Sequence, residues 1–344
     1  MNPTETLRIG VAGLHHDHIW GVLHGAFENP AVRLVSAADP YPALRERFER
    51  EFHLPTYANY EAVLEDETLH AVYIFTDNRT KADLTCAAAA RGLHVLVEKP
   101  LAADGADARR MLEATRNAGV RLMVNWPYAW WPALQHGIHL AQEGHLGRLW
   151  HVRYRGAHQG PENCGCSPYF QEWLFDAHRN GGGVLVDYCC YGANLASVLL
   201  QNPQSVTGFT GTLTKPFFPL EDNATLIVRY PEAMATLEGS WSQTGKLTAY
   251  TTVIHGTTGT YMIEPYREGR ILHATAEHPD GQPIEVPALP PHLAEPTQHF
   301  LWALTEEKPF LPLCDPLNAL QAQLILDAGA KAAWEHHECP VAPV

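Results

Sequence analysis

The chain has 344 residues, of which 46% are hydrophobic and 18% charged, so it is long enough for two domains of ordinary globular composition. Its formal net charge of -14 disfavours nucleic acid and anionic membranes as partners, and no apolar run approaches the ~18 residues of a membrane span. Seven cysteines, an odd number, and no visible signal peptide predict reduced thiols and a cytoplasmic protein.

The first third of the chain alternates short apolar runs with helix-like segments, which is typical of βαβ units around a parallel sheet. The predicted strands are Leu7–Ala12, Val32–Ala37, Ala71–Phe75, His94–Val97 and Arg121–Val124. The predicted helices are Ile19–Phe27, Pro42–Glu51, Thr80–Arg91 and Gly105–Ala118, the last ended by Gly119. We therefore predict an α/β, doubly wound, dinucleotide-binding Rossmann domain over residues 1–125.

The turn after the first strand, residues 13–18, stands where a dinucleotide-binding fold places its glycine loop, with the pyrophosphate on the next helix. The glycine pattern is incomplete, because His15 and His18 replace the second and third glycines. Histidines that face phosphate or solvent are one interpretation, and a metal site is the other. We favour the first, because three histidines of one loop cannot converge on an ion without ligands from elsewhere.

Two further motifs bear on cofactors. Asp39 ends the second strand where a carboxylate accepts hydrogen bonds from the adenosine ribose, which favours NAD and leaves NADP as the alternative. A simple turn at Asp39-Pro40 would explain the same residue. The pair Cys164 and Cys166 lacks the spacing and the second pair of a zinc ribbon, so we predict no metal.

Beyond residue 125 the pattern changes to longer strands joined by turns. The predicted elements are a helix at Ala133–Glu143, strands at Leu149–Gly156, Ala224–Tyr230, Met234–Ser240, Thr248–His255 and Thr260–Ile263, and helices at His292–Thr305 and Asp315–His336. We predict an α+β domain over residues 126–344, built on a mainly antiparallel open sheet, whose last helix can pack back on the first domain.

Two polar motifs stand out. Glu98-Lys99-Pro100 ends a parallel strand at the edge where open α/β sheets bind ligands, and the proline restricts Lys99 to an extended conformation. After three glycines at 181–183, Asp187, Tyr191 and Asn194 are spaced so that a helix would present them on one face. A surface ion pair at Glu98–Lys99 and a simply packed Tyr191 are the alternatives.

These motifs, in this order, resemble those of the Gfo/Idh/MocA oxidoreductases, the family of glucose–fructose oxidoreductase and inositol dehydrogenase. The family more often has histidine where this chain has Tyr191. The resemblance implies NAD- or NADP-dependent hydride transfer to or from a hydroxyl-bearing carbon of a sugar, polyol or cyclic alcohol. It also implies a homodimer or homotetramer formed through the second sheet. A non-catalytic nucleotide-binding sensor and redox-neutral, NAD-dependent glycoside cleavage remain alternatives.

Roles follow for the site residues. Tyr191 would exchange the hydroxyl proton, Lys99 would polarise the oxygen and lower the tyrosine's pKa, and Asp187 would orient the substrate or Lys99. Residues expected at the cofactor are Gly13, Leu14, His15, His18, Asp39, Thr76, Asn78, Glu98 and Lys99. Residues expected at the substrate are Asn125, Trp126, His158, Trp173, His178 and Asn194. The aromatic run at 126–131 would stack on sugar faces or, as an equal alternative, form an interdomain core.

Overall fold

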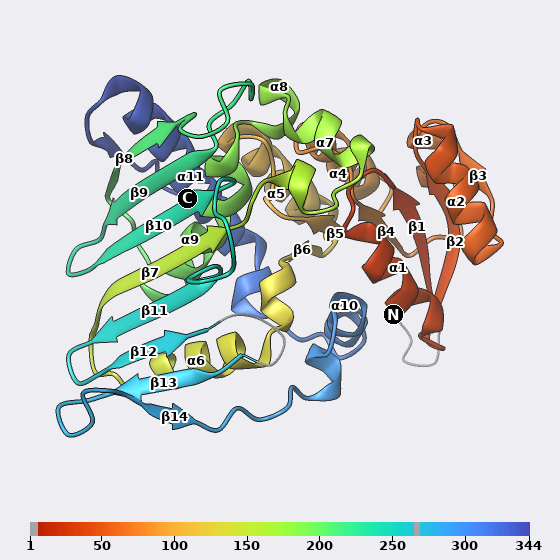
Figure 1. Cartoon of the computed structure of the whole chain (residues 1–344). Helices are drawn as coiled ribbons and strands as arrows, with labels where there is room; N and C mark the ends of the chain where they lie inside the picture. Colours follow the sequence, from red (N-terminus) through yellow and green to blue (C-terminus); the bar gives the residue numbers. More distant parts are fainter. Residues whose placement is uncertain (1–5, 265–268) are drawn as a thin grey trace.

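A computed structural model describes residues 6–264 and 269–344, which form two sheets with helices packed against them (Figure 1). The expectation about a signal peptide falls mostly on residues 1–5, which lie outside the described residues. Within the described ranges, no helix combines the length and the apolar character needed to cross a bilayer. All seven cysteines lie in these ranges and are free thiols.

The first sheet has six parallel strands in the order β3-β2-β1-β4-β5-β6. Its elements are β1 (Leu7–Ala12), α1 (Ile19–Glu28), β2 (Val32–Ala38), α2 (Pro42–Phe52), β3 (Thr56–Tyr57), α3 (Glu61–Leu64), β4 (Ala71–Ile74), α4 (Thr80–Ala90), β5 (His94–Glu98), α5 (Gly105–Ala118) and β6 (Leu122–Asn125). The strand order reverses between β1 and β4, and such a switch point opens a crevice at the carboxyl ends of the strands. The predicted doubly wound fold is confirmed.

The second sheet has nine strands in the order β14-β13-β12-β11-β7-β10-β9-β8-β15. Its elements are η1 (Pro127–Trp130), α6 (Pro132–Gln142), β7 (Leu149–Ala157), η2 (Pro161–Asn163), α7 (Pro168–Leu174), α8 (Ala177–Asn180), α9 (Val184–Leu199), β8 (Ser205–Gly211), β9 (Asn223–Arg229), β10 (Met234–Ser240), β11 (Thr251–Gly256), β12 (Thr260–Ile263), β13 (Ile271–Ala274), β14 (Gln282–Ile284), η3 (Pro291–Leu293), α10 (Pro296–Thr305), η4 (Pro312–Cys314), α11 (Pro316–Glu335) and β15 (Cys339–Pro340). Every pair is antiparallel except β7 with β10, which confirms the predicted, mainly antiparallel sheet.

Helices cover one face of this second sheet. Helix α9 packs on β7, β9 and β10, and α11 packs on α9 and β8 (Figure 1). Helix α11 also contacts α5 of the first sheet, where Asp327 accepts a hydrogen bond of 2.8 Å from the backbone of Gly105. The alternation along β9 places Leu226 and Val228 in the core and leaves Ile227 on the open face. The two sheets are thus joined through buried helices.

Candidate functional site

Lys99 follows β5 at the carboxyl edge of the first sheet, and it meets α9 of the second part of the chain. Its Nζ donates to Asp187 Oδ1 at 2.7 Å and lies 4.8 Å from the ring centroid of Tyr191. All three residues are buried, with exposed fractions of 3% for Lys99 and 7% for the other two. The structure therefore brings the three expected catalytic residues together.

The Lys99–Asp187 pair is held in its charged form. Burial disfavours both charges, but each partner outweighs it, so the pKa of Lys99 is raised and the pKa of Asp187 is lowered. The second oxygen of Asp187 accepts a hydrogen bond of 3.2 Å from the indole of Trp241. Sequence reasoning missed Trp241, because it lies in another strand region with no motif around it.

Tyr191 lies in an aromatic cluster rather than beside a cation that would ionise it. Its ring stacks on Tyr154 at 5.9 Å and meets the edges of Trp126 and Tyr128. Burial raises the pKa of Tyr191 well above its ordinary value. The expectation that Lys99 lowers this pKa is therefore wrong: its ammonium lies over the ring and is paired with Asp187.

Asn194 does not share a cleft with Asp187 and Tyr191. Its amide donates to the hydroxyl of Tyr128 at 3.2 Å and to the carbonyl of Leu313 at 2.9 Å, and it is fully buried. Helix α9 is covered by the sheet on one side and by α11 on another. Its polar residues therefore lie in different buried surroundings and do not face one common cleft. The predicted single polar face is wrong for Asn194, which packs within the core.

The loop after β1 fits a bound dinucleotide at two points. Gly13 has φ +97, and a Cβ there would lie 2.6 Å from the backbone of Phe75, so only glycine fits. Helix α1 has no side-chain cap from its N-cap residue and no acidic residue in its first turn, so its amino terminus favours an anion, although the N–H groups of His18 and Ile19 already donate to His16. Leu14 and Thr76 are buried beside this turn, and the Thr76 hydroxyl donates to the Asp77 carbonyl.

His15 and Asp39 bind each other. Asp39 Oδ2 accepts from the Leu14 backbone at 2.7 Å and lies 2.8 Å from His15 Nδ1, while its Oδ1 accepts from the Tyr41 backbone. The other nitrogen of His15 accepts from the backbone of Asp77 at 3.2 Å. The ribose contact of Asp39 stays a prediction, and in this structure it would require these bonds to exchange.

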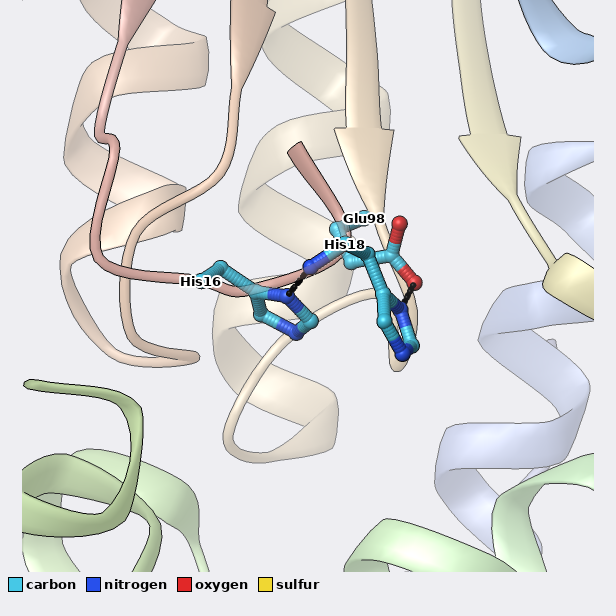
Figure 2. Close-up of side chains that lie close together, drawn as sticks. All are labelled: His16, His18 and Glu98. Atoms are coloured by element: carbon cyan, nitrogen blue, oxygen red, sulfur yellow. Dashed lines mark hydrogen bonds and ion pairs between the residues drawn. The ribbon is translucent and has the colours of Figure 1, made fainter. Parts of the chain in front are cut away.

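His16 and His18 lie near Glu98 at the end of β5, and of the two rings only that of His18 is joined to its carboxylate (Figure 2). His18 Nδ1 lies 3.0 Å from Glu98 Oε1, and the other Glu98 oxygen accepts a hydrogen bond of 2.6 Å from the amide of Asn125. Burial lowers the pKa of His16 well below its ordinary value, so this ring is neutral. The three loop histidines therefore separate: His15 binds Asp39, His18 binds Glu98 from a distant strand, and the His16 ring accepts a hydrogen bond of 3.4 Å from the His18 backbone.

Lys81 is a buried cation that sequence reasoning assigned no role. Its Nζ donates to Asn78 Oδ1 at 2.8 Å and to the carbonyls of Glu98 and Pro100 at 2.7 Å each. Burial lowers the pKa of Lys81 to about 7. Asn78 uses its amide to bind Asn180, so a cofactor contact by Asn78 stays a prediction. Lys81 thus fixes the backbone on both sides of Lys99.

Replacing Lys81 with methionine should destabilise the fold. Three buried acceptors would lose their donor, each at about 1–3 kcal/mol, and relief from burying the ammonium offsets only part of this cost, so we expect a loss of about 3 kcal/mol. Urea unfolding measures it. Lys331→Met, at an exposed position on α11, is the matched control and should change the unfolding free energy by less than about 0.5 kcal/mol. Equal stabilities for the two variants would refute this role.

The residues expected at the substrate fall into two groups. Asn125, Trp126 and Trp173 are buried, Trp126 against the Tyr191 ring and Trp173 against His16. His178 is exposed on α8, and its ring is not in the buried site. His158 accepts a hydrogen bond from the Gly160 backbone at 2.8 Å and lies against Tyr188. The aromatic run at 126–131 is largely a packed core, and direct substrate contact stays a prediction.

The segment with α7 and α8 ties the second part of the chain to the first sheet (Figure 1). Asp17 accepts a hydrogen bond of 2.7 Å from the Ser167 backbone, and Asn180 accepts from Asn78 at 2.8 Å. Gly181 then turns the chain with φ +92, and a Cβ there would meet the Ala103 carbonyl at 2.3 Å. The first glycine of the motif at 181–183 is thus required by close backbone contact.

Acid should destabilise the fold through three histidines. His94, His158 and His299 each accept a hydrogen bond from a backbone N–H, and burial lowers their pKa from 6.5 to about 4. Between these values the unfolded chain binds more protons than the folded chain, so the unfolding free energy must fall as pH falls. Urea midpoints measured across this range should decrease steadily, and a constant midpoint would contradict the assignment.

Comparison with known proteins agrees with this architecture. Residues 7–126 match the family model described as "Oxidoreductase family, NAD-binding Rossmann fold", and residues 135–262 match the "GFO/IDH/MocA C-terminal domain". Together the two matches cover well over half of the chain.

Individual relatives are more distant. D-xylose 1-dehydrogenase (NADP(+)) 2 of Haloferax volcanii is 34% identical over 46% of this chain and 47% of its own length. Levoglucosan dehydrogenase of Pseudarthrobacter phenanthrenivorans is 24% identical over 72% of this chain and 68% of its own. A solved levoglucosan dehydrogenase, in complex with NADH and levoglucosan, shares the fold with a TM-score of 0.83 at 22% identity, covering 99% of this chain and 100% of that one. The chain belongs to the Gfo/Idh/MocA oxidoreductase family.

Proposed function

We propose that this protein is an NAD(P)-dependent dehydrogenase or reductase that transfers a hydride to or from a hydroxyl-bearing carbon of a sugar, polyol or related cyclic alcohol. The observation that carries the proposal is the position of Lys99, whose ammonium lies 2.7 Å from Asp187 and 4.8 Å from the Tyr191 ring at the carboxyl edge of the sheet. Membership of a family with an NAD-binding Rossmann fold supplies the hydride carrier.

Three side chains have distinct roles in this reaction. Lys99 donates a hydrogen bond to the reacting oxygen and stabilises negative charge on it. Asp187 holds the ammonium in place and keeps it charged. Tyr191 is protonated at neutral pH because its pKa is raised, so it can donate its proton to the oxygen as a carbonyl is reduced and then regain a proton from solvent. In the oxidation direction it must first release this proton to solvent before it accepts the proton of the substrate hydroxyl.

The cofactor would lie along the edge formed by Gly13, the start of α1 and Glu98. Asp39 favours NAD over NADP, because its carboxylate can accept hydrogen bonds from the hydroxyls of the adenosine ribose. To do so it would exchange its present bonds with His15 and with the backbone of Leu14 and Tyr41 for bonds to these hydroxyls. Relatives named for xylose, levoglucosan and scyllo-inositol support a carbohydrate or cyclic polyol as the substrate. His158 and Trp173 are the proposed residues on the substrate side.

The test is cofactor binding followed by turnover. NAD⁺ and NADP⁺ should each be titrated in a thermal shift assay, since a ligand of the native state raises the melting temperature in a concentration-dependent way. Absorbance of the reduced cofactor is then followed across a panel of sugars and polyols. Binding without any absorbance change would favour a sensor, and release of a sugar without net reduction would favour glycoside cleavage.

We also propose that the protein is a homodimer or homotetramer in the cytoplasm. The open face of the second sheet exposes Trp150, Ile227 and Met234, whose exposed fractions are 42%, 42% and 40%, and contiguous apolar patches favour association. Light scattering after size exclusion should give two or four times the 38.2 kDa chain mass. Ile227→Glu should shift the protein toward the monomer, whereas a monomeric wild type would end this proposal.

A further inference from the structure

The loop after β1 and the end of β5 together present a set of metal-binding groups on the edge proposed for the cofactor, none of which has a role in the proposed proton transfer. One nitrogen each of His16 and His18 and one carboxylate oxygen of Glu98 lie within 4.8 Å of one another (Figure 2). Two histidines and one carboxylate are a donor set that proteins use for Zn²⁺ and Fe²⁺ at sites with open coordination positions.

The three ligands are supported in the way metal ligands usually are. Glu98 is fully buried, and its second oxygen is held by the Asn125 amide at 2.6 Å, whose own oxygen accepts from the Trp130 indole at 2.9 Å. The ring of His16 is fixed by Phe170 and by Trp173, with centroids 4.8 and 5.4 Å away. Partners of this kind orient ligands and raise affinity.

Only a small movement is needed for the groups to share one ion. Metal–ligand bonds of about 2.0–2.2 Å keep two ligands of one ion within about 4.2 Å of each other. Because all the ligand atoms lie within 4.8 Å of one another, no pair has to approach by more than about 0.6 Å. The His18 side chain is 37% exposed, so it has room to move, and this exposure also leaves a side from which an ion can enter.

We propose that His16, His18 and Glu98 form a binding site for a divalent transition metal ion of the zinc class, with open positions for water or a ligand oxygen. The ligands are on the same sheet edge as Lys99, whose positive charge is balanced by Asp187. The inference goes beyond the proposed dehydrogenase function and does not rest on it, because it concerns ion binding to the protein without cofactor.

A second cluster in the described part of the chain requires a control. Glu335, His337 and Cys339, after α11, also place ligand atoms within 4.8 Å of one another. This cluster contains a thiol and the first does not. Cobalt(II) distinguishes them, because a thiolate ligand adds an intense near-ultraviolet charge-transfer band that histidine and carboxylate ligands lack.

The experiment uses the full chain after treatment with chelator, with no dinucleotide added. Co²⁺ is titrated while the visible ligand-field bands are followed, and bound Co²⁺ is then displaced with Zn²⁺. We expect one equivalent of bound Co²⁺ without a thiolate band in both the wild type and His337→Gln. His18→Gln and Glu98→Gln should each weaken binding by at least about 100-fold, since loss of a second-shell partner alone costs ~10–100-fold.

Circular dichroism of His18→Gln and Glu98→Gln establishes that both variants are folded before they are titrated. Unchanged Co²⁺ affinity in both of these variants overturns the proposal. So does a wild type that binds no ion, or one whose only bound cobalt shows the thiolate band and is lost in His337→Gln. Cofactor binding and turnover are measured separately, so failure of this site is distinguishable from failure of the proposed function.

Discussion

Replacing Lys99 with methionine should reduce turnover by about 10²–10³-fold, the typical effect of losing a donor to a developing oxyanion. The same change leaves the Asp187 carboxylate buried without its cation, which should lower the unfolding free energy by about 3–5 kcal/mol. Steady-state kinetics with the best substrate of the panel and urea unfolding measure the two effects.

The double variant Lys99→Met/Asp187→Asn separates catalysis from folding. A neutral amide at 187 can still accept from the Trp241 indole, so most of the lost stability should return. Turnover should not return, because the donor to the reacting oxygen is still missing. Recovery of both properties together would mean that Lys99 acts only on stability, and the catalytic role would be abandoned.

Replacing Tyr191 with phenylalanine should lower turnover by about 10²–10⁴-fold, the usual contribution of a general acid or base. The ring contacts with Trp126 and Tyr154 do not involve the hydroxyl, so the melting temperature should change little. The defect should appear mainly in kcat, since the hydroxyl acts on the reacting oxygen during the chemical step. Kinetics across the substrate panel provide the measurement.

Tyr154→Phe is the matched control, because Tyr154 stacks on Tyr191 and its buried hydroxyl has no hydrogen-bond partner among the described residues. Removing an unsatisfied buried hydroxyl should leave the stability equal or higher. Its turnover should stay close to that of the wild type. If both variants lost activity equally, packing of the aromatic cluster rather than the Tyr191 proton would explain the effect.

The fold could be predicted from the sequence where periodicity was strong. Gly105–Ala118 and Met234–Ser240 have the predicted bounds, because a capped amphipathic helix and an alternating strand both leave clear patterns. The two-residue strand Thr56–Tyr57 and the helix Glu61–Leu64 are too short to show a period. The edge strand Gln282–Ile284 is stabilised by its neighbour, which no local pattern reveals.

The site could be predicted only as far as its motifs extended. The sequence pointed to Lys99, Asp187 and Tyr191 together, but not to the direction of the Tyr191 pKa, because that depends on burial by distant rings. It did not point to Lys81 or Trp241, whose partners are backbone carbonyls and a carboxylate brought near by the fold. Nor did it show that Glu98 would complete a histidine pair, since 80 residues separate it from His18.

The three bonds of Lys81 have a consequence for engineering. Two of them attach the carbonyls on either side of Lys99 to α4, and the third holds the side chain of Asn78, so substitutions at 98–100 that move this backbone would disturb several buried contacts at once. The loop from 158 to 166, in contrast, includes exposed positions such as Asn163 and Cys164. Libraries in that loop should therefore retain folded protein more often than libraries at the strand end.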